Sequence, residues 1–136
     1  MRNLQGRSLG EVNKRRKMRI AITAQGKELS SKIETRFGQT KWLIAVDTQT
    51  GDVSAYNTMV NLGTGILGVQ TAQNVVDLDV EIVITGNIGP NAFTVISTSG
   101  IKVFLSQGAI EEVLVLFKEG KLNEAKVANV PTHWSS

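Results

Sequence analysis

Short apolar runs rich in β-branched residues alternate along the chain with segments of helical periodicity, beginning at Met18. Runs of the first kind are typical of strands, and they predict strands at residues 19–23, 41–47, 52–57, 81–85 and 101–105. Apolar side chains spaced three and four residues apart are typical of helices. They predict one helix from Ile66, one from Pro90 and one over 110–117. The polar segment 24–40 is irregular, and loops of that length in compact domains are often functional.

The order of these elements is strand, hairpin, helix, strand, helix, strand, helix. Residues 48–51, which read Thr-Gln-Thr-Gly, are a turn signal, so the strands that flank them are expected to be antiparallel. The later strands are joined through helices, and a strand–helix–strand connection places its two strands in parallel. The sequence therefore predicts an α/β fold, a three-layer α/β/α domain whose five-stranded mixed sheet carries helices on both faces.

Basic residues are concentrated at the start of the chain. The 136 residues carry a net charge of +3 with an isoelectric point near 9.4. Residues 1–17 hold six basic residues and one acidic residue, whereas the remainder holds nine and eleven. We expect 1–17 to be a disordered extension, a cloning remnant or an upstream start ahead of Met18, with a nucleic-acid or membrane-surface arm as the alternative. A single domain is expected over 18–122, followed by a loosely held tail over 123–136.

The composition argues against most catalytic, metal-binding and membrane functions. The chain has no cysteine and one histidine, His133, in the predicted tail, which excludes disulfides, thiolate catalysis and cysteine-ligated clusters. Asp47, Asp52, Asp77 and Asp79 lie in predicted turns or at a helix end, so no catalytic group is expected and the protein is predicted not to be an enzyme. The body lacks a basic stripe with interleaved aromatics, which disfavours nucleic acid. No apolar run approaches 18 residues, so a cytoplasmic protein without a membrane partner is expected.

Two glycine-rich segments precede predicted helices. The first, 63–68, reads G-x-G-x-x-G, the pattern of a dinucleotide fingerprint, but no carboxylate follows the next strand to hold a ribose hydroxyl. A tight turn or an anion-binding helix start fits it better. The second, 86–91, follows a predicted central strand at the sheet edge where α/β proteins bind ligands. Main-chain amides at such positions suit an anionic ligand, and plain turns are the alternative for both segments.

Several of these segments resemble the dinitrogenase iron–molybdenum cofactor-binding family, the small NifX/NifB-type nitrogenase accessory domains. The resemblance covers about residues 18–122 and rests on 18–23, 36–38, 65–72, 81–93 and 100–103. It implies a ribonuclease-H-like motif and an iron–molybdenum or iron–sulfur cluster as the cofactor. Members that carry the cofactor place a histidine directly before Phe-Gly, where this chain has Arg36. Since the chain has no cysteine and no core histidine, a cluster would have to arrive with its own ligands.

The resulting hypothesis is a non-enzymatic binding or carrier domain that holds an anionic ligand and exchanges it with a cluster-donating protein. An organic carboxylate on the ligand would suit Arg36. The expected binding residues are Arg36, Phe37, Gly38, Gly63, Thr64, Gly65, Gly68, Gly86, Asn87, Gly89 and Asn91. A protein-interaction or regulatory module of the same fold without a cofactor is the alternative, and a dinucleotide-using enzyme is the third reading.

Overall fold

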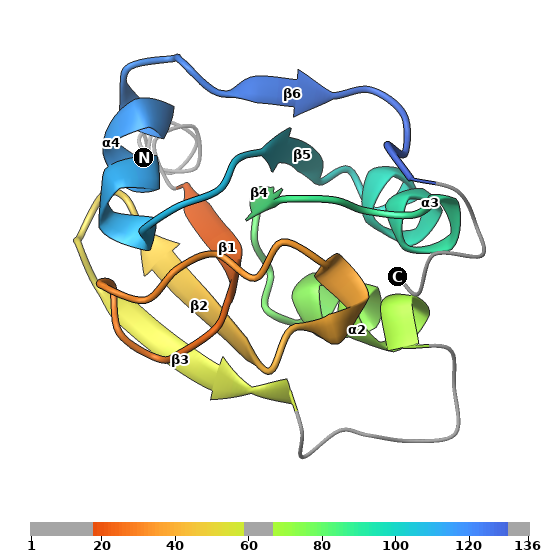
Figure 1. Ribbon diagram of the computed structural model, residues 1–136, viewed down its shortest axis with the longest axis horizontal. Helices are drawn as coiled ribbons and strands as arrows, with labels where there is room; N and C mark the ends of the chain where they lie inside the picture. The colour runs from red at the N-terminus through yellow and green to blue at the C-terminus, as the bar shows by residue number, and fades with distance from the viewer. Residues whose placement is uncertain (1–17, 59–66, 131–136) are drawn as a thin grey trace, which may run out of the picture.

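The computed structural model describes residues 18–58 and 67–130, which build one six-stranded mixed sheet and the helices around it (Figure 1). In chain order the strands are β1 (Arg19–Ala24), β2 (Trp42–Asp47), β3 (Val53–Asn57), β4 (Ile82–Thr85), β5 (Lys102–Leu105) and β6 (Asn123–Ala125). Across the sheet the order is β3-β2-β1-β4-β5-β6, so β1 lies inside the sheet while β3 and β6 are its two edges.

The pairing directions confirm the predicted mixed sheet. β1 pairs with β2 in antiparallel fashion and with β4 in parallel, and β4 pairs in parallel with β5. β2 and β3 form the predicted antiparallel hairpin. In its turn, Oδ1 of Asp47 accepts hydrogen bonds from the amides of Gln49 and Thr50 at 2.9 and 3.1 Å. Gly51 has a φ of +83°, the left-handed conformation that glycine adopts without strain.

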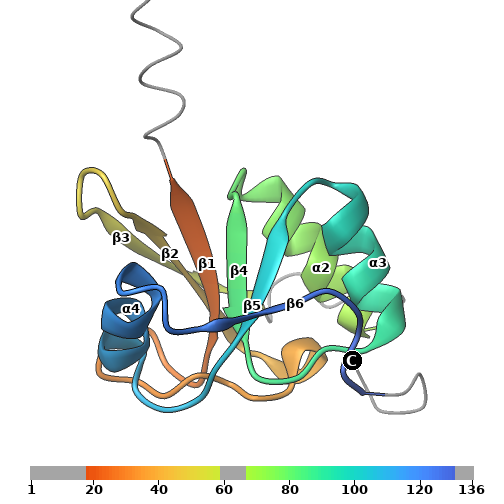
Figure 2. The same ribbon diagram turned by 90° about the horizontal axis from the view of Figure 1, so that it is seen from above.

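Helices cover both faces of the sheet, as the three-layer prediction requires (Figure 2). α2 (Leu67–Asp77) and α3 (Pro90–Thr98) lie on one face, and α4 (Ile110–Lys118) lies on the other. The 3₁₀ turn η1 (Phe37–Gln39) contacts α2. α3 begins at Pro90, where the missing N–H leaves no intrahelical bond unmade. Within the described part of the chain, no helix has the length and apolar content needed to cross a bilayer.

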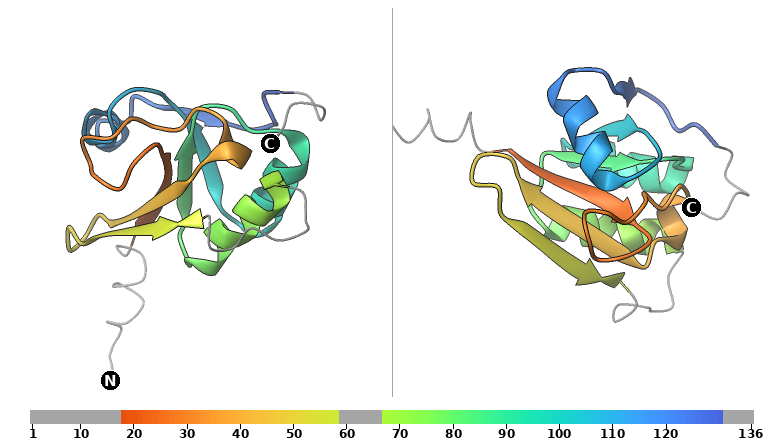
Figure 3. Two further views of the ribbon diagram at one scale, coloured as in Figure 1. Left: turned by 60° about the horizontal axis from the view of Figure 1, so that its bottom comes forward. Right: turned by 60° about the vertical axis from the view of Figure 1, so that its left-hand side comes forward.

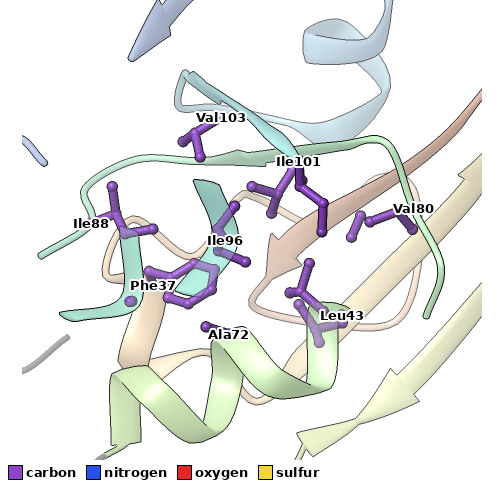
Figure 4. Close-up of a cluster of buried hydrophobic side chains, with 12 residues drawn as sticks. Phe37, Leu43, Ala72, Val80, Ile88, Ile96, Ile101 and Val103 are labelled. Carbon is purple, nitrogen blue, oxygen red and sulfur yellow. The ribbon is translucent and has the colours of Figure 1, made fainter. Parts of the chain in front are cut away.

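The pleat of the central strands divides the core into two layers. Ala21 of β1 and Val83 of β4 face α2 and α3, whereas Ile20 and Ile82 face α4. The layer beneath α2 and α3 is centred on Phe37, which is fully buried (Figure 4). Since β1 and β4 are covered on both faces, they consist of nearly continuous apolar residues, the pattern expected of buried parallel strands.

The sheet has one strand more than the five that the sequence predicts. β6 lies within the segment assigned to a loosely held tail, and it pairs in antiparallel fashion with β5. Its three residues, Asn-Glu-Ala, have neither β-branched side chains nor a clear alternation, so their extended conformation comes from pairing with the open edge of β5 rather than from local preference. The predicted leader 1–17 lies outside the described residues.

Candidate functional site

Three loops gather at one end of the sheet, where the parallel strands have their carboxyl ends (Figure 2). They are the β1–β2 loop (25–41), the β4–α3 loop (86–89) and the β5–α4 loop (106–109). The amide of Ile33 donates to the carbonyl of Gly108, and the amide of Ile110 donates to the carbonyl of Ser31, both at 2.9 Å. Main-chain hydrogen bonds to the β5–α4 loop therefore hold the long β1–β2 loop in place. These bonds could not be predicted from the sequence of the loop.

The β1–β2 and β4–α3 loops lie side by side, and their main chains are in direct contact. The amide of Phe37 donates to the carbonyl of Asn87 at 3.0 Å, and Nδ2 of Asn87 donates to the carbonyl of Thr35 at 3.1 Å. Arg36 and Asn87 form an isolated parallel bridge. The contact needs glycine at position 86, because a Cβ there would lie 2.7 Å from Cα of Thr35.

Two buried hydroxyl groups connect β1, β4 and the β1–β2 loop beneath the site. The Oγ1 atoms of Thr23 and Thr85 are 2.8 Å apart, and Oγ1 of Thr23 is also 2.8 Å from the carbonyl oxygen of Glu34. A carbonyl oxygen can only accept, and each hydroxyl has one proton. Thr23 therefore donates to Glu34 and accepts a hydrogen bond from Thr85.

The direction of these two hydrogen bonds predicts that Thr85→Val and Thr23→Val lower the free energy of unfolding by different amounts. Thr85→Val removes one donor and leaves Thr23 bonded to Glu34, so we expect a loss of about 1 kcal/mol in the free energy of unfolding. Thr23→Val deprives both the Glu34 carbonyl and the Thr85 hydroxyl of this partner, and we expect a loss of about 2–3 kcal/mol. Urea unfolding of the two variants measures the difference. An equal or larger loss in Thr85→Val would contradict the assigned direction.

A pocket of about 260 Å³ opens between the three loops; we call it the carboxyl-end pocket. It is lined by Thr35, Gly86, Asn87, Leu105, Ser106 and Gln107. The lining contains a threonine and a serine hydroxyl, two carboxamides and main-chain groups, but no ionisable side chain. Its chemistry is therefore that of neutral hydrogen-bond donors and acceptors, which can hold a polar or anionic group without bringing a counter-charge of their own.

The predicted binding residues fall into separate groups in the structure. Gly86 and Asn87 line the carboxyl-end pocket, and Arg36, which is exposed, is bridged to Asn87 at its rim. The amide of Arg36 donates to Oε2 of Glu34 at 3.2 Å. Of the other predicted residues, Phe37, Gly38, Gly68 and Gly89 are buried, and Asn91 is exposed within α3. Gly63, Thr64 and Gly65 lie outside the described residues.

Asn129, from the predicted tail, contacts the same loop. Its amide donates to the carbonyl of Ile88 at 3.1 Å, and its Oδ1 accepts from the amide of Ile88 at 2.7 Å. Its Nδ2 also donates to Oδ1 of Asn87 at 2.9 Å. The amide of Ile88 lies in the segment expected to bind an anion through its main chain, and in this structure it is already bound to a side chain.

The sequence reasoning missed Asn129 and most of the pocket lining. Ser106 and Gln107 follow β5 at its carboxyl end, so the edge rule that selected 86–91 would also have found them. Thr35 directly precedes a predicted binding residue. For Asn129 no local signal exists, because its role depends on where the tail crosses the fold.

Direct ligation of a metal is not supported by these side chains. Among residues 18–58 and 67–130, no group of three or more His, Cys, Asp or Glu side chains could hold a metal ion. The whole sequence contains no cysteine. The donor set around the carboxyl-end pocket consists of hydroxyls, carboxamides and amides, which are weak ligands for iron. Such groups are better suited to hydrogen bonding with an anion than to direct coordination of a metal ion.

Comparison with known proteins gives concordant matches. Residues 18–120 match the sequence model of the family described as dinitrogenase iron-molybdenum cofactor. An uncharacterized protein of Methanocaldococcus jannaschii is 31% identical over 111 residues, which cover 79% of this chain and 91% of that protein.

Solved structures show the same architecture. The apo form of the orange protein from Desulfovibrio gigas superposes with a TM-score of 0.77 at 27% identity, and the match covers 83% of this chain and 97% of the other. A candidate NifB protein from Thermotoga superposes with a TM-score of 0.71 at 33% identity, over the same shares of the two chains.

Proposed function

Because the chain belongs to the dinitrogenase iron–molybdenum cofactor family, we propose that it is a non-enzymatic accessory domain that binds and carries an anionic ligand. The observation that carries this proposal is the carboxyl-end pocket, where loops from three strands present neutral hydrogen-bond donors. It lies at the carboxyl ends of parallel strands, the usual place for ligands in α/β sheets. Family membership supplies the class of function, and the pocket supplies the chemistry of recognition.

Arg36 is the charged group best placed to add to this recognition. It is bridged to the pocket residue Asn87 through its main chain and is exposed to solvent. A guanidinium group forms paired hydrogen bonds with carboxylates and other oxyanions. It does not act as a metal ligand in the way an imidazole does. An arginine before Phe-Gly therefore favours recognition of the ligand's anionic periphery.

A metal cluster would be cargo in this proposal, not a resident group of the protein. The residues present do not fit a cluster that depends on the chain for thiolate or imidazole ligands. They fit an anion that carries its own donor atoms and is held by hydrogen bonds from outside. Release to another protein then requires no exchange of metal ligands.

The test is a titration with molybdate and with citrate, followed by the backbone amide signals in NMR spectra. We expect shifts at residues 35–37, 86–88 and 106–107. Arg36→Gln should weaken binding about threefold to tenfold, because a charge-assisted hydrogen bond is lost at an exposed site. Asn129→Ala should also weaken binding, because Nδ2 of Asn129 no longer holds Oδ1 of the pocket residue Asn87 in place.

Lys118→Gln is the matched control, since it removes the same charge from the last turn of α4. It should leave both affinities unchanged. If Lys118→Gln weakens binding as much as Arg36→Gln does, the effect is one of net charge and not of a site. If neither anion shifts the signals of the three loops, the carrier proposal is wrong for this pocket.

A protein-interaction role is the second candidate, and one observation favours it. Val115 and Leu116 are consecutive residues of α4 and are 53% and 37% exposed. Exposed large apolar side chains on a helix are candidates for contact with another protein. Substituting Val115 and Leu116 would separate the two roles, because the carboxyl-end pocket contains neither residue.

A further inference from the structure

A second pocket lies between α2 and the end of β3, and it shares no residue with the carboxyl-end pocket. Figure 3 shows the end of β3 (yellow) beside α2 (light green). The volume of this pocket is about 130 Å³, and we call it the α2–β3 pocket. The lining residues that determine its chemistry are Leu43, Tyr56, Asn74, Asp77 and Leu78. The carrier proposal makes no use of them.

Strand register and helical spacing explain why these side chains meet. Tyr56 lies directly opposite Leu43 in the β2–β3 pair, and Leu43 belongs to the core layer beneath α2. Residues opposite each other point to the same face of a sheet, so the tyrosine ring also lies on the α2 side. Leu43 is 1% exposed and Tyr56 is 41% exposed. The pocket therefore has an apolar floor at Leu43 and opens to solvent beside an aromatic ring.

The α2 wall of the pocket is polar and carries a negative charge. Asn74, Asp77 and Leu78 are spaced three and four residues apart, so they lie on one side of the helix end. Oδ1 of Asp77 accepts a hydrogen bond from Nε2 of Gln73 at 3.2 Å, which orients the carboxylate. Within residues 18–58 and 67–130, Asp77 forms no ion pair. The pocket thus presents a carboxylate without a counter-charge from the described chain.

The position of this carboxylate in the helix is electrostatically unfavourable. Asp77 is the last residue of α2, whose final turn has no basic residue. The carbonyl end of a helix carries a partial negative charge, so a carboxylate there is repelled. The guanidinium of Arg19 donates to the carbonyl of Leu78, which satisfies one group of the helix end, but it makes no ion pair with Asp77. A cation bound in the pocket would relieve this repulsion.

We propose that the α2–β3 pocket binds the head of an organic cation, an alkylguanidinium or alkylammonium group. Asp77 supplies the opposite charge, and the ring of Tyr56 attracts a cation beside it. Leu43 packs against the carbon atoms next to the charged head. An apolar cavity of about 150 Å³ holds a benzene molecule, so the pocket has room for the head and a short alkyl stem. An anion would meet a carboxylate and no basic side chain in this lining.

The test is a titration of the full chain with butylguanidinium and with butylammonium, followed by the backbone amide signals in NMR spectra. We expect saturable shifts at residues 56–58 and 74–78. Butylurea has the shape of butylguanidinium without its charge, and it should cause no saturable shift there. If butylurea binds as tightly as butylguanidinium, or if neither cation shifts these signals, the proposal is wrong.

Asp77→Asn is the decisive variant because it keeps the shape of the side chain and removes its charge. It should weaken binding of both cations at least about threefold. The melting temperature should be unchanged or higher, because a carboxylate leaves the negative end of the helix. A lower melting temperature with unchanged affinity would assign Asp77 a structural role and overturn the proposal. Glu111→Gln, in the first turn of α4 on the opposite face of the sheet, is the charge control and should leave the affinity unchanged.

Two substitutions of Tyr56 test the contribution of its ring. Tyr56→Leu should weaken binding of butylguanidinium about twofold to fivefold, the range for a cation beside an exposed aromatic ring. Tyr56→Phe keeps the ring and should bind about as tightly as the wild type. Equal losses in the two variants would contradict the role of the ring.

A blocked amino acid identifies the source of the cation. Nα-acetylarginine amide carries the guanidinium group on a peptide main chain. If it binds at least as tightly as butylguanidinium, the ligand is an arginine side chain of another protein; if it binds more weakly, the ligand is a free alkyl cation. Both results uphold the class of ligand. Failure of the carrier proposal would change none of these outcomes, because the two pockets have no residue in common.

Discussion

Gly86→Ala is expected to destabilise the protein by about 2–3 kcal/mol and to abolish binding at the carboxyl-end pocket. The new Cβ would lie 2.7 Å from Cα of Thr35 and 2.9 Å from its carbonyl oxygen. Both are main-chain atoms, so no side-chain rotation can relieve the contact, and the β1–β2 and β4–α3 loops must separate. Overpacking of this kind typically costs about 1–3 kcal/mol. Urea unfolding and the molybdate titration measure the two effects.

Gly51→Ala is the matched control for this substitution. A Cβ on Gly51 would meet no atom within 4 Å, but its φ of +83° strains any other residue. We expect a loss of about 1 kcal/mol with anion binding intact. If the loss in Gly86→Ala does not exceed that in Gly51→Ala, the two loops are less tightly packed than the structure indicates.

Phe37→Ala is expected to cost about 3–5 kcal/mol, the range for truncating a fully buried phenylalanine. The ring is 0% exposed and packs among Ile88, Ile96 and Ala72 (Figure 4). It joins the β1–β2 loop, which provides Phe37, to α2 and α3. Its amide also donates to Asn87, so loss of the ring should loosen the pocket as well as the core. Urea unfolding gives the stability, and amide exchange of residues 86–88 reports on the loop.

Phe37→Leu tests whether the core needs the aromatic ring itself or only a large apolar side chain at this position. Leucine keeps most of the buried surface, so we expect a loss below about 1.5 kcal/mol. Equal losses in the leucine and alanine variants would show that the site depends on the aromatic ring itself. A loss below 1 kcal/mol in Phe37→Ala would contradict the central place of this residue in the core.

The sequence was sufficient for those elements whose own residues determine them. The apolar runs 19–23 and 81–85 became β1 and β4, and the spacing of Ile110, Val113 and Leu114 became the buried face of α4. β6 was not predictable, because its Asn-Glu-Ala segment is extended only through pairing with β5. The conformation of the β1–β2 loop could not be predicted either, because hydrogen bonds to β1 and to the β5–α4 loop hold it in place.

The candidate site was predictable where it depends on position along a strand. Gly86 and Asn87 follow β4 at its carboxyl end, and they line the pocket. Phe37 was selected with the site but lies in the core, where glycine-rich or aromatic motifs often have a packing role. Asn129 could not be found, because a single asparagine far along the chain has no pattern that indicates its partner. Such contacts depend on the tertiary course of the chain, which periodicity does not encode.

The position of β1 within the sheet has a consequence for how the chain acquires its structure. β1, β2 and β3 are consecutive and pair locally, but Ile20 pairs with Ile82 and Ile22 with Ile84, across 62 residues. Long-range pairings of this kind must overcome loop-closure entropy before they gain any contact energy, and they slow folding. On a ribosome the first three strands emerge well before β4. Until then the inner edge of β1 has no partner, and the nascent meander is the stage at which the chain is most exposed to misassembly.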